Sequence, residues 1–415
     1  MKIILIYLLI ISYWAEMVLG FELTTIPGLS FLNIILYIFI IIWLLSILKR
    51  KATTRHHKVY KYFIMMFIVM LFAIIVKKLK NQIPNVNVLE EVIWIKGWLN
   101  PFIIFVVLFN MIDNRETCNK AIFGLIMLLI VTVVGQILGA FEIINYDAAT
   151  LARRGRAAGM GDINDYASFL VLFIPLLISS FLFKKDIRLK LFYGSLLCFS
   201  MVGLIITGSR GGVLSFFFSM LVLSFLLVKE KFIKLSRIFL IGTFFILISF
   251  SSFLILPSHV TEGYKVRFDP TQVRDINDFT SSRLFLWTNG LLFFLESPLY
   301  GHGNNSYLPL LIQKFKKRGV AHNQYLEHAV SYGIIGLFIY LMIHITIIKF
   351  VINNLRVAKE VWSKQLYISY LSGLGGYLFA LLNINRGISG YPLWIFTAII
   401  CSHCYFNSID NVKLK

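Results

Sequence analysis

Long apolar runs recur from one end of this 415-residue chain to the other, and they constrain its fold more than any other feature. Apolar and aromatic residue types make up 58% of the chain and charged residues only 14%, against roughly 25% charged residues in soluble domains. Because so few polar groups are available to cover a surface, the solvent of this chain must be lipid. A soluble enzyme, a disordered protein and a nucleic-acid-binding protein are excluded, despite the net charge of +20.

The apolar runs predict an all-α, polytopic integral membrane protein. A helix of about 20 apolar residues crosses the hydrocarbon core and satisfies its own backbone hydrogen bonds. About twelve transmembrane helices follow from this length. The candidate segments are 3–20, 29–48, 60–76, 93–112, 121–140, 166–183, 191–208, 211–228, 238–256, 328–347, 366–383 and 391–407. We expect one membrane domain over residues 1–415, with a large extracytoplasmic loop at 257–327 late in the chain.

The distribution of Lys and Arg predicts how these helices are oriented. Most of the 40 Lys and Arg residues fall in the segments that are cytoplasmic when the N-terminus is inside. The excess grows when the long loop 257–327 is left out, as it should be, because long loops do not follow the rule. We therefore predict that both termini are cytoplasmic and that the loop 257–327 faces outward.

Arginines in the outward segments need a separate explanation, because topology selects against them. Arg156 stands in a run of arginines and glycines, Arg210 lies between glycines in a tight turn, and Arg283 lies in the long loop. A guanidinium group binds two phosphate oxygens at once, and adjacent glycines let backbone N–H groups approach an anion. These residues predict an anion-binding site at the outer membrane face, at the depth of a lipid-linked pyrophosphate.

Each candidate has a simpler alternative role. Arg156 could instead contact anionic lipid headgroups. The side chain of Arg210 could instead extend to the membrane interface and help only to orient the helices, a role that any cation could fill. Arg283 has the alternative of an ordinary salt bridge on an amphipathic helix. His322 precedes a predicted helix and is a candidate proton acceptor, because histidine titrates near neutral pH. Its alternative is to cap that helix or to anchor the loop.

No pattern in the chain predicts a metal or a cofactor. Cys401 and Cys404 flank His403, but structural zinc needs four ligands and the sequence offers no second pair. The chain also lacks the paired carboxylates of a metal-dependent transferase and a glycine-rich nucleotide loop after a strand. We expect metal-independent chemistry without a cofactor.

The outward motifs, in their order, resemble the family of O-antigen polymerases and O-antigen ligases. The stretch Arg156–Asn164 is similar to an Arg- and Gly-rich segment of that family. The resemblance is strongest over 205–340, and elsewhere it rests on topology. The resembling segments there are Gly208–Gly212, Arg283 with Trp287, Ser297–Gly303, His322–Glu327 and Gly333–Leu337.

This resemblance implies metal-independent glycosyl transfer at the outer face of a bacterial inner membrane. The donor would be a glycan on undecaprenyl pyrophosphate, with a second lipid-linked glycan as acceptor. Arg156, Arg210 and Arg283 would bind the pyrophosphate. All three arginines would stabilise the charge that develops on the pyrophosphate as it leaves, and His322 would orient or deprotonate the acceptor. The leading hypothesis is a polymerase of a surface polysaccharide (O-antigen, capsule or exopolysaccharide), with membrane lipid, a flippase and a chain-length regulator as partners.

Other hypotheses remain open. An O-antigen ligase, which transfers the glycan to the lipid A core, shares the same motifs. A flippase or other transporter of lipid-linked glycans belongs to a different class, as does a non-catalytic assembly partner. Transporters are expected to show inverted repeats and charges at the membrane midplane, whereas the charges of this chain lie at the predicted outer face.

Overall fold

The computed structural model contains helices and no strand in the residues that it describes, which are 2–19, 29–49, 54–80, 87–143, 162–234, 254–258, 260–262, 282–384 and 390–413. The helices are α1 (Lys2–Leu19), α2 (Phe31–Leu48), α3 (Tyr60–Lys80), α4 (Val88–Met111), α5 (Arg115–Ala140), α7 (Ile163–Phe183), α8 (Ile187–Ile206), α9 (Arg210–Lys229), α13 (Arg283–Glu296), α14 (Tyr307–Phe315), α15 (Gln324–Val357), α16 (Val361–Ala380) and α17 (Tyr391–Lys413).

The predicted all-α membrane fold is confirmed. Each predicted segment except 238–256 corresponds to one of these helices, and most of 238–256 lies outside the described residues. Of the helices described, 8 are long and apolar enough to cross a membrane by length and composition. α16 is not among them, because Gly, Ser and Tyr lower its hydropathy; neighbouring helices surround most of it.

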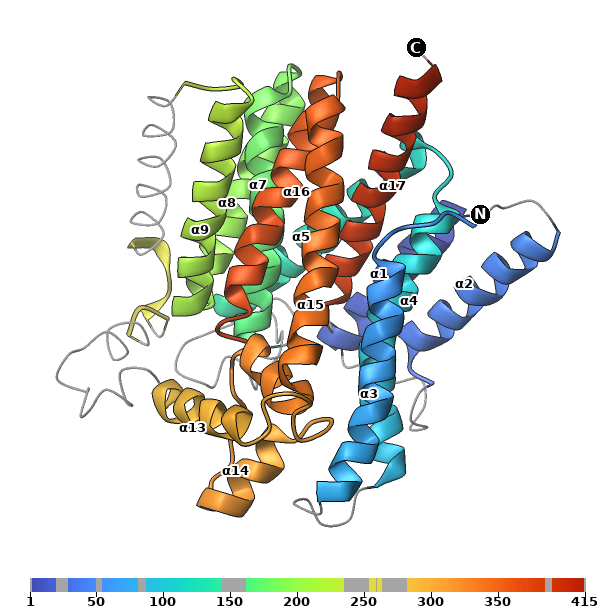
Figure 1. The fold of residues 1–415 in the computed structure, drawn as a ribbon. Coiled ribbons are helices and arrows are strands. Elements are labelled where there is room, and N and C mark those ends of the chain that lie inside the picture. Colours follow the sequence, from blue (N-terminus) through green and yellow to red (C-terminus); the bar gives the residue numbers. More distant parts are fainter. Residues whose placement is uncertain are drawn as a thin grey trace.

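Helices α7 and α16 form the centre of the bundle (Figure 1). α16 packs against both α7 and α9, and nearly the whole of α7 is buried. The approach is close because Gly373 of α16 faces the α7 backbone, where a Cβ would lie 2.1 Å from the carbonyl oxygen of Leu172. A single apolar cluster extends from this centre through helices from α1 to α17.

The helices of the bundle begin and end at two opposite ends. α7, α9 and α15 begin at the end where α16 terminates, and α13 and α14 lie there too (Figure 1). We term this the α13 end. α5, α8 and α16 begin at the opposite end. A small apolar cluster joins α13 and α14 to α15, and it consists of Leu286, Phe293, Tyr307, Leu310, Leu311, Ala321 and Val330.

Glu16, a charged residue inside the first predicted span, has a backbone partner. Its carboxylate accepts a hydrogen bond from the N–H of Leu32 in the first turn of α2. The first N–H groups of a helix have no partner within the helix, and the positive end of the helix favours a carboxylate. Glu16 therefore joins α1 to α2.

Candidate active site

A short turn between α8 and α9 places Arg210 at the α13 end. Ser209 caps α9: its Oγ accepts a hydrogen bond from the Gly212 N–H at 3.1 Å and donates one to Asn164 Oδ1 at 2.8 Å. A larger residue at position 212 is excluded, because a Cβ there would lie 2.6 Å from the Cβ of Ala167. The start of α9, with Arg210 as its first residue, is therefore held against the start of α7.

Arg283 reaches the same region from α13. It is the first residue of that helix and is half-buried. Its guanidinium donates a hydrogen bond to Asn383 Oδ1 at 2.7 Å, in the turn that follows α16. Asn383 also packs on α9, since a Cβ on Gly211 would lie 2.9 Å from the Asn383 Cβ. Within the described residues, the partner of Arg283 is thus an amide and not the carboxylate of the salt-bridge alternative.

His322 stands directly before α15 in an unusual backbone conformation. Its φ is 47°, in the left-handed region that residues other than glycine rarely adopt. The cap of α15 is the next residue, Asn323, whose Oδ1 accepts from the Leu326 N–H at 3.1 Å. The Gln324 N–H donates to the Leu381 carbonyl at 2.8 Å and so ties α15 to the end of α16. The capping alternative for His322 is therefore wrong, and its ring makes no hydrogen bond with the described residues.

The ionisable groups at the starts of α7, α9, α13 and α15 act on one another, so they share one site. Burial lowers the pKa of Arg283, nearby Arg210 lowers it further, and Asp162 raises it. Burial also lowers the pKa of His322, with a further lowering by Arg283 and an opposing effect of Asp162. The imidazole of His322 is therefore neutral at pH 7. Arg283 near His322 and Arg210 near Arg283, both partly withdrawn from water, make a site that favours an anion.

Helix N-termini add to this positive potential. α7, α9, α13 and α15 all begin at the site. The first N–H groups of a helix carry partial positive charge, and they point away from the helix toward whatever lies at its start. Several such ends around two arginines form the arrangement that proteins use to bind phosphate groups.

A break within α15 fixes the segment that follows His322. Gly333 has φ 64° and ψ −165°, so α15 consists of two helices joined at a kink. The break frees the N–H of Ile334, which donates to the Pro298 carbonyl at 2.8 Å in the loop after α13. Only glycine fits at this contact, since a Cβ on Gly333 would lie 2.3 Å from the carbonyl carbon of Leu299. The loop after α13 and the start of α15 therefore form one unit.

A buried polar network fastens the same loop to α3 and α4. Lys77 forms an ion pair with Glu91 and donates a hydrogen bond to the Asn304 carbonyl at 2.9 Å. Asn304 Nδ2 donates to the second Glu91 oxygen at 2.8 Å. Charged groups as deeply buried as these are stable only when paired and hydrogen-bonded. The network thus holds the loop that supports the start of α15.

The structure brings together Arg210, Arg283 and His322, while the predicted Arg156 lies outside the described residues. Sequence reasoning missed Asn383 and the role of Asp162. Asp162 belongs to the Arg- and Gly-rich segment and caps α7. Its place in that segment, directly before an apolar run, is the signal by which the sequence could have indicated it. Asn383 follows an apolar helix, and its contact with Arg283 joins positions 100 residues apart.

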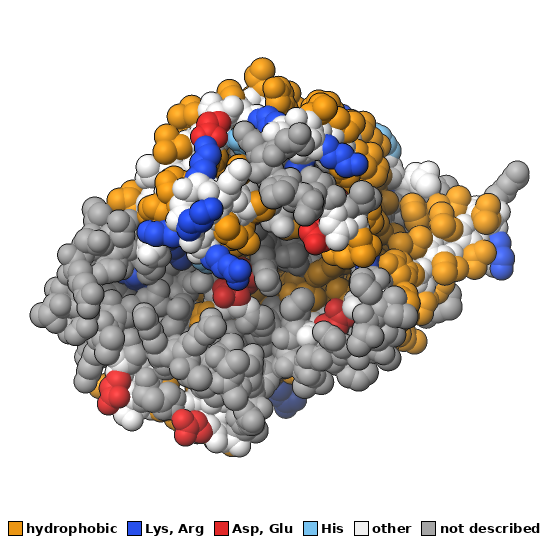
Figure 2. All heavy atoms as spheres, turned by 90° about the horizontal axis from the view of Figure 1, so that it is seen from below, with side chains coloured by type: hydrophobic (Ala, Val, Ile, Leu, Met, Phe, Trp, Pro, Cys, Tyr) orange, Lys and Arg blue, Asp and Glu red, His pale blue; other side chains and the backbone are white. Residues whose placement is uncertain are grey.

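Exposed cations gather at the same end of the bundle as the candidate site. Figure 2 shows Lys and Arg side chains gathered on the α13 end. Lys314 pairs with Glu296, and the Lys317 ammonium lies 4.4 Å from the ring centroid of Phe285. The exposed cations at the end of α14 are Lys314, Lys316, Lys317 and Arg318. They form a solvated basic surface, which attracts anions to this end.

No group of three or more His, Cys, Asp and Glu that could hold a metal ion occurs among the described residues. Cys401 and Cys404 are buried in α17. His403 lies between them, and its Nδ1 shares a hydrogen bond of 2.9 Å with the Tyr367 hydroxyl. These residues pack inside the bundle, and metal independence stays a prediction.

Comparison with known proteins gives a family match for part of the chain. Residues 194–341 match the family model described as O-antigen ligase. This range contains Arg210, Arg283 and His322, and the resemblance seen in the sequence is confirmed. The chain is also 32% identical over 89 residues to an uncharacterized protein of Haemophilus influenzae. That match covers 19% of this chain and 22% of the Haemophilus protein, so the chain spans about a fifth of that relative's length.

Proposed function

We propose that this chain is a bacterial surface-polysaccharide polymerase, a proposal supported by the match of residues 194–341 to the family model described as O-antigen ligase. The family match supports glycan transfer by a membrane glycosyltransferase-like protein in general terms. Within that activity, the donor is an oligosaccharide on undecaprenyl pyrophosphate and the acceptor is a second lipid-linked glycan. The site faces outward from the inner membrane, a flippase supplies the substrate, and a chain-length regulator is a further partner.

One observation carries this proposal. Two partly buried guanidinium groups interact at the starts of helices, Arg210 with Arg283, and Arg283 in turn lowers the pKa of His322 and so favours its neutral ring. The cations and N–H groups suit a pyrophosphate, and the imidazole suits a hydroxyl that must lose a proton. A site for both groups is what glycosyl transfer from a lipid pyrophosphate requires.

The residues have distinct roles in the proposed reaction. The acceptor hydroxyl oxygen attacks the anomeric carbon of the donor and forms the new glycosidic bond. The bond between that carbon and the pyrophosphate oxygen breaks, and its electron pair leaves with the pyrophosphate. Arg210 and Arg283 stabilise the negative charge that develops there. His322 accepts the proton of the hydroxyl through its neutral nitrogen.

Conservative substitutions test these roles. Arg210→Lys keeps the charge but loses the two-point contact, so we expect a loss of activity of at least about tenfold, close to that of Arg210→Ala. His322→Gln keeps a hydrogen-bonding side chain but cannot take the proton, and it should be inactive. Polysaccharide chain length on gels is the measurement, with expression checked for each variant.

Arg318 supplies the matched control. It is an exposed arginine at the end of α14, so Arg318→Lys and Arg318→Ala should leave chain length unchanged. Full activity of both Arg210→Lys and His322→Gln would contradict the proposed roles, because a topological cation or a structural side chain would tolerate those changes.

The description of the matched model, O-antigen ligase, favours a second candidate within the same family. The acceptor distinguishes the two. Purified protein given lipid-linked glycan as the sole substrate should form longer lipid-linked products if it is a polymerase. A ligase would form product only after lipid A core is added, and that result would replace the polymerase proposal.

A further inference from the structure

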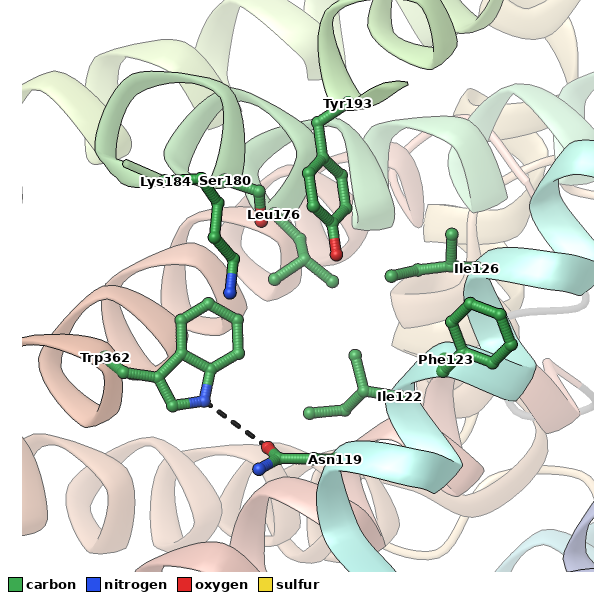
Figure 3. A pocket seen from close by; sticks show the side chains of 9 residues that line it. All are labelled: Asn119, Ile122, Phe123, Ile126, Leu176, Ser180, Lys184, Tyr193 and Trp362. Carbon is green, nitrogen blue, oxygen red and sulfur yellow. Dashed lines mark hydrogen bonds between the residues drawn. The ribbon is translucent and has the colours of Figure 1, made fainter. Parts of the chain in front are cut away.

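A cavity of about 360 Å³ lies at the end of the bundle opposite the candidate active site. α7 ends here, and α5, α8 and α16 begin here. The cavity has a polar side and an apolar side (Figure 3). Its polar side includes Ser180, Lys184 and Tyr193, and its apolar side includes Ile122, Phe123 and Ile126.

Lys184 gives this cavity a cation that has no carboxylate partner among the described residues. Its ammonium group lies 4.2 Å from the ring centroid of Trp362. The indole N–H of Trp362 donates to Asn119 Oδ1 at 3.3 Å, which fixes the ring under the ammonium. Burial lowers the pKa of Lys184, and no carboxylate among the described residues opposes that effect. An anion in the cavity would supply the missing charge.

Hydroxyl groups beside Lys184 add hydrogen-bond donors. Ser180 is almost fully buried, and its Oγ has no hydrogen-bond partner in the described part of the chain. A buried hydroxyl without a partner is costly, so a ligand that accepts its hydrogen bond is favoured. Figure 3 shows the Lys184 ammonium and the Tyr193 hydroxyl pointing into the space bordered by the apolar side chains.

Two carboxylates at this end of the bundle, those of Glu360 and Glu230, are paired with other cations, and Asp186 caps α8 by accepting a hydrogen bond from the Arg188 N–H. Glu360 accepts a hydrogen bond from Arg115 at 2.7 Å. Glu230 accepts one from Lys364 at 2.8 Å. Their charges are therefore compensated, and the charge of Lys184 remains available to a ligand.

The apolar side of the cavity opens toward lipid. Phe123 is 50% exposed on the outside of α5. It also borders a second cavity of about 350 Å³ between α1 and α5, which Tyr7, Ile11 and Met127 line as well. A ligand with an anionic group and a long apolar chain fits this cavity, because its anionic group suits the polar side and its chain suits the apolar side.

We propose that this cavity binds the phosphate group of an anionic phospholipid from the leaflet at this end of the bundle. The Lys184 ammonium and the hydroxyl groups of Ser180 and Tyr193 bind the phosphate oxygens. The acyl chain lies along Ile122, Phe123 and Ile126. Helix ends stand at the depth of the headgroups, where anionic lipids attract basic residues. The site is separate from the one that we assign to glycan transfer.

Lipid titration of the purified, delipidated full-length protein tests this proposal. The probes are dioleoylphosphatidylglycerol, dioleoylphosphatidylcholine and glycerol phosphate, and the readout is the rise of the unfolding temperature with probe concentration. Phosphatidylglycerol should protect the protein more strongly than phosphatidylcholine. Glycerol phosphate should not protect, because it lacks the acyl chains; equal protection by glycerol phosphate would overturn the lipid assignment in favour of a free anion.

Variants localise the effect. Lys184→Gln should weaken phosphatidylglycerol binding by about tenfold, since a contact to a charged group is lost. Lys185→Gln is the matched control, because Lys185 is the exposed neighbour outside the cavity. Tyr193→Phe keeps the ring and removes the hydroxyl, so it should weaken binding even if Lys184→Gln fails to fold. Identical titrations of Tyr193→Phe, Lys185→Gln and the unmodified protein would overturn the proposal.

Discussion

His322 has a backbone conformation that costs on the order of 1–3 kcal/mol for a residue with a side chain. The φ of 47° persists because the residues after it are fixed: Asn323 caps α15, and the Gln324 N–H bonds to the Leu381 carbonyl. In this conformation the imidazole makes no hydrogen bond to the described residues and lies close to Arg283. This setting is consistent with the role of proton acceptor that we propose for His322.

The pKa of His322 leads to a pH prediction. Because burial and Arg283 hold it below its ordinary value of 6.5, the neutral ring persists at pH 7, and activity should fall only as the pH drops below 6.5. Asp162→Asn removes the charge that raises this pKa but keeps a good helix cap. The acid limb of the pH–rate profile should therefore move to lower pH. A move to higher pH would contradict the neutral-base role.

Asn383 positions Arg283, and a double substitution can separate positioning from stability. Asn383→Leu removes the hydrogen bond of 2.7 Å to the guanidinium. We expect activity to fall by about tenfold, because hydrogen bonds to charged groups contribute about 1.5–3 kcal/mol. In an Arg283→Ala background the same change should have no further effect on residual activity. Equal losses in both backgrounds would show that Asn383 acts independently of Arg283.

At the scale of single helices, the contact between α7 and α16 depends on a glycine. A Cβ at position 373 would lie 2.1 Å from the Leu172 carbonyl oxygen, whereas a Cβ at 375 meets nothing closer than 3.5 Å. Gly373→Ala should destabilise the protein by about 1–3 kcal/mol through overpacking. Gly375→Ala, on the same helix, should be neutral or slightly stabilising. Thermal unfolding in detergent measures both, and similar unfolding temperatures would contradict the close contact.

The long apolar helices could be predicted from the sequence, but α13 and α14 are not among the predicted segments, and the break in α15 could not be predicted. A run of apolar residues of the required length sets each span, and even Pro101 and Pro175 stay within their helices. The apolar run likewise continues on both sides of Gly333, so the sequence does not indicate that the helix breaks there. The kink there exists because the carbonyl of Pro298 replaces the helical partner of the Ile334 N–H. Such a replacement is a tertiary contact, which local sequence does not encode.

For the whole molecule, the ordered motifs predicted which residues meet, but not how they are held. Arg210, Arg283 and His322 were recognised because their motifs resemble a family. The support from Asn383 and from the pair of Lys77 and Glu91 depends on contacts between helices far apart in the chain. These partners stand in ordinary apolar or charged surroundings, so composition and spacing carry no sign of them.

The two ends of the bundle lead to a final prediction, which concerns orientation. If the excess of Lys and Arg in short loops sets topology, the α13 end faces outward and the loop between α15 and α16 is cytoplasmic. Gln313 is exposed on α14, and Lys359 is exposed in that short loop. Three of the native cysteines are buried, and Cys198→Ala removes the partly exposed fourth. In that background, we expect Gln313→Cys to react with an impermeant thiol reagent in intact or outer-membrane-permeabilised cells.

Lys359→Cys is the control for the same experiment, because it should react only after lysis. The reverse pattern would place the α13 end in the cytoplasm. A donor glycan displayed on the outer leaflet would then be out of reach of Arg210 and Arg283, since the length of the helices separates the two faces. The orientation experiment therefore tests the proposed polymerisation as well as the topology. The reverse pattern would not contradict phospholipid binding at Lys184. That proposal requires only that anionic headgroups lie at the end of the bundle opposite the candidate active site, whichever side of the membrane that end faces.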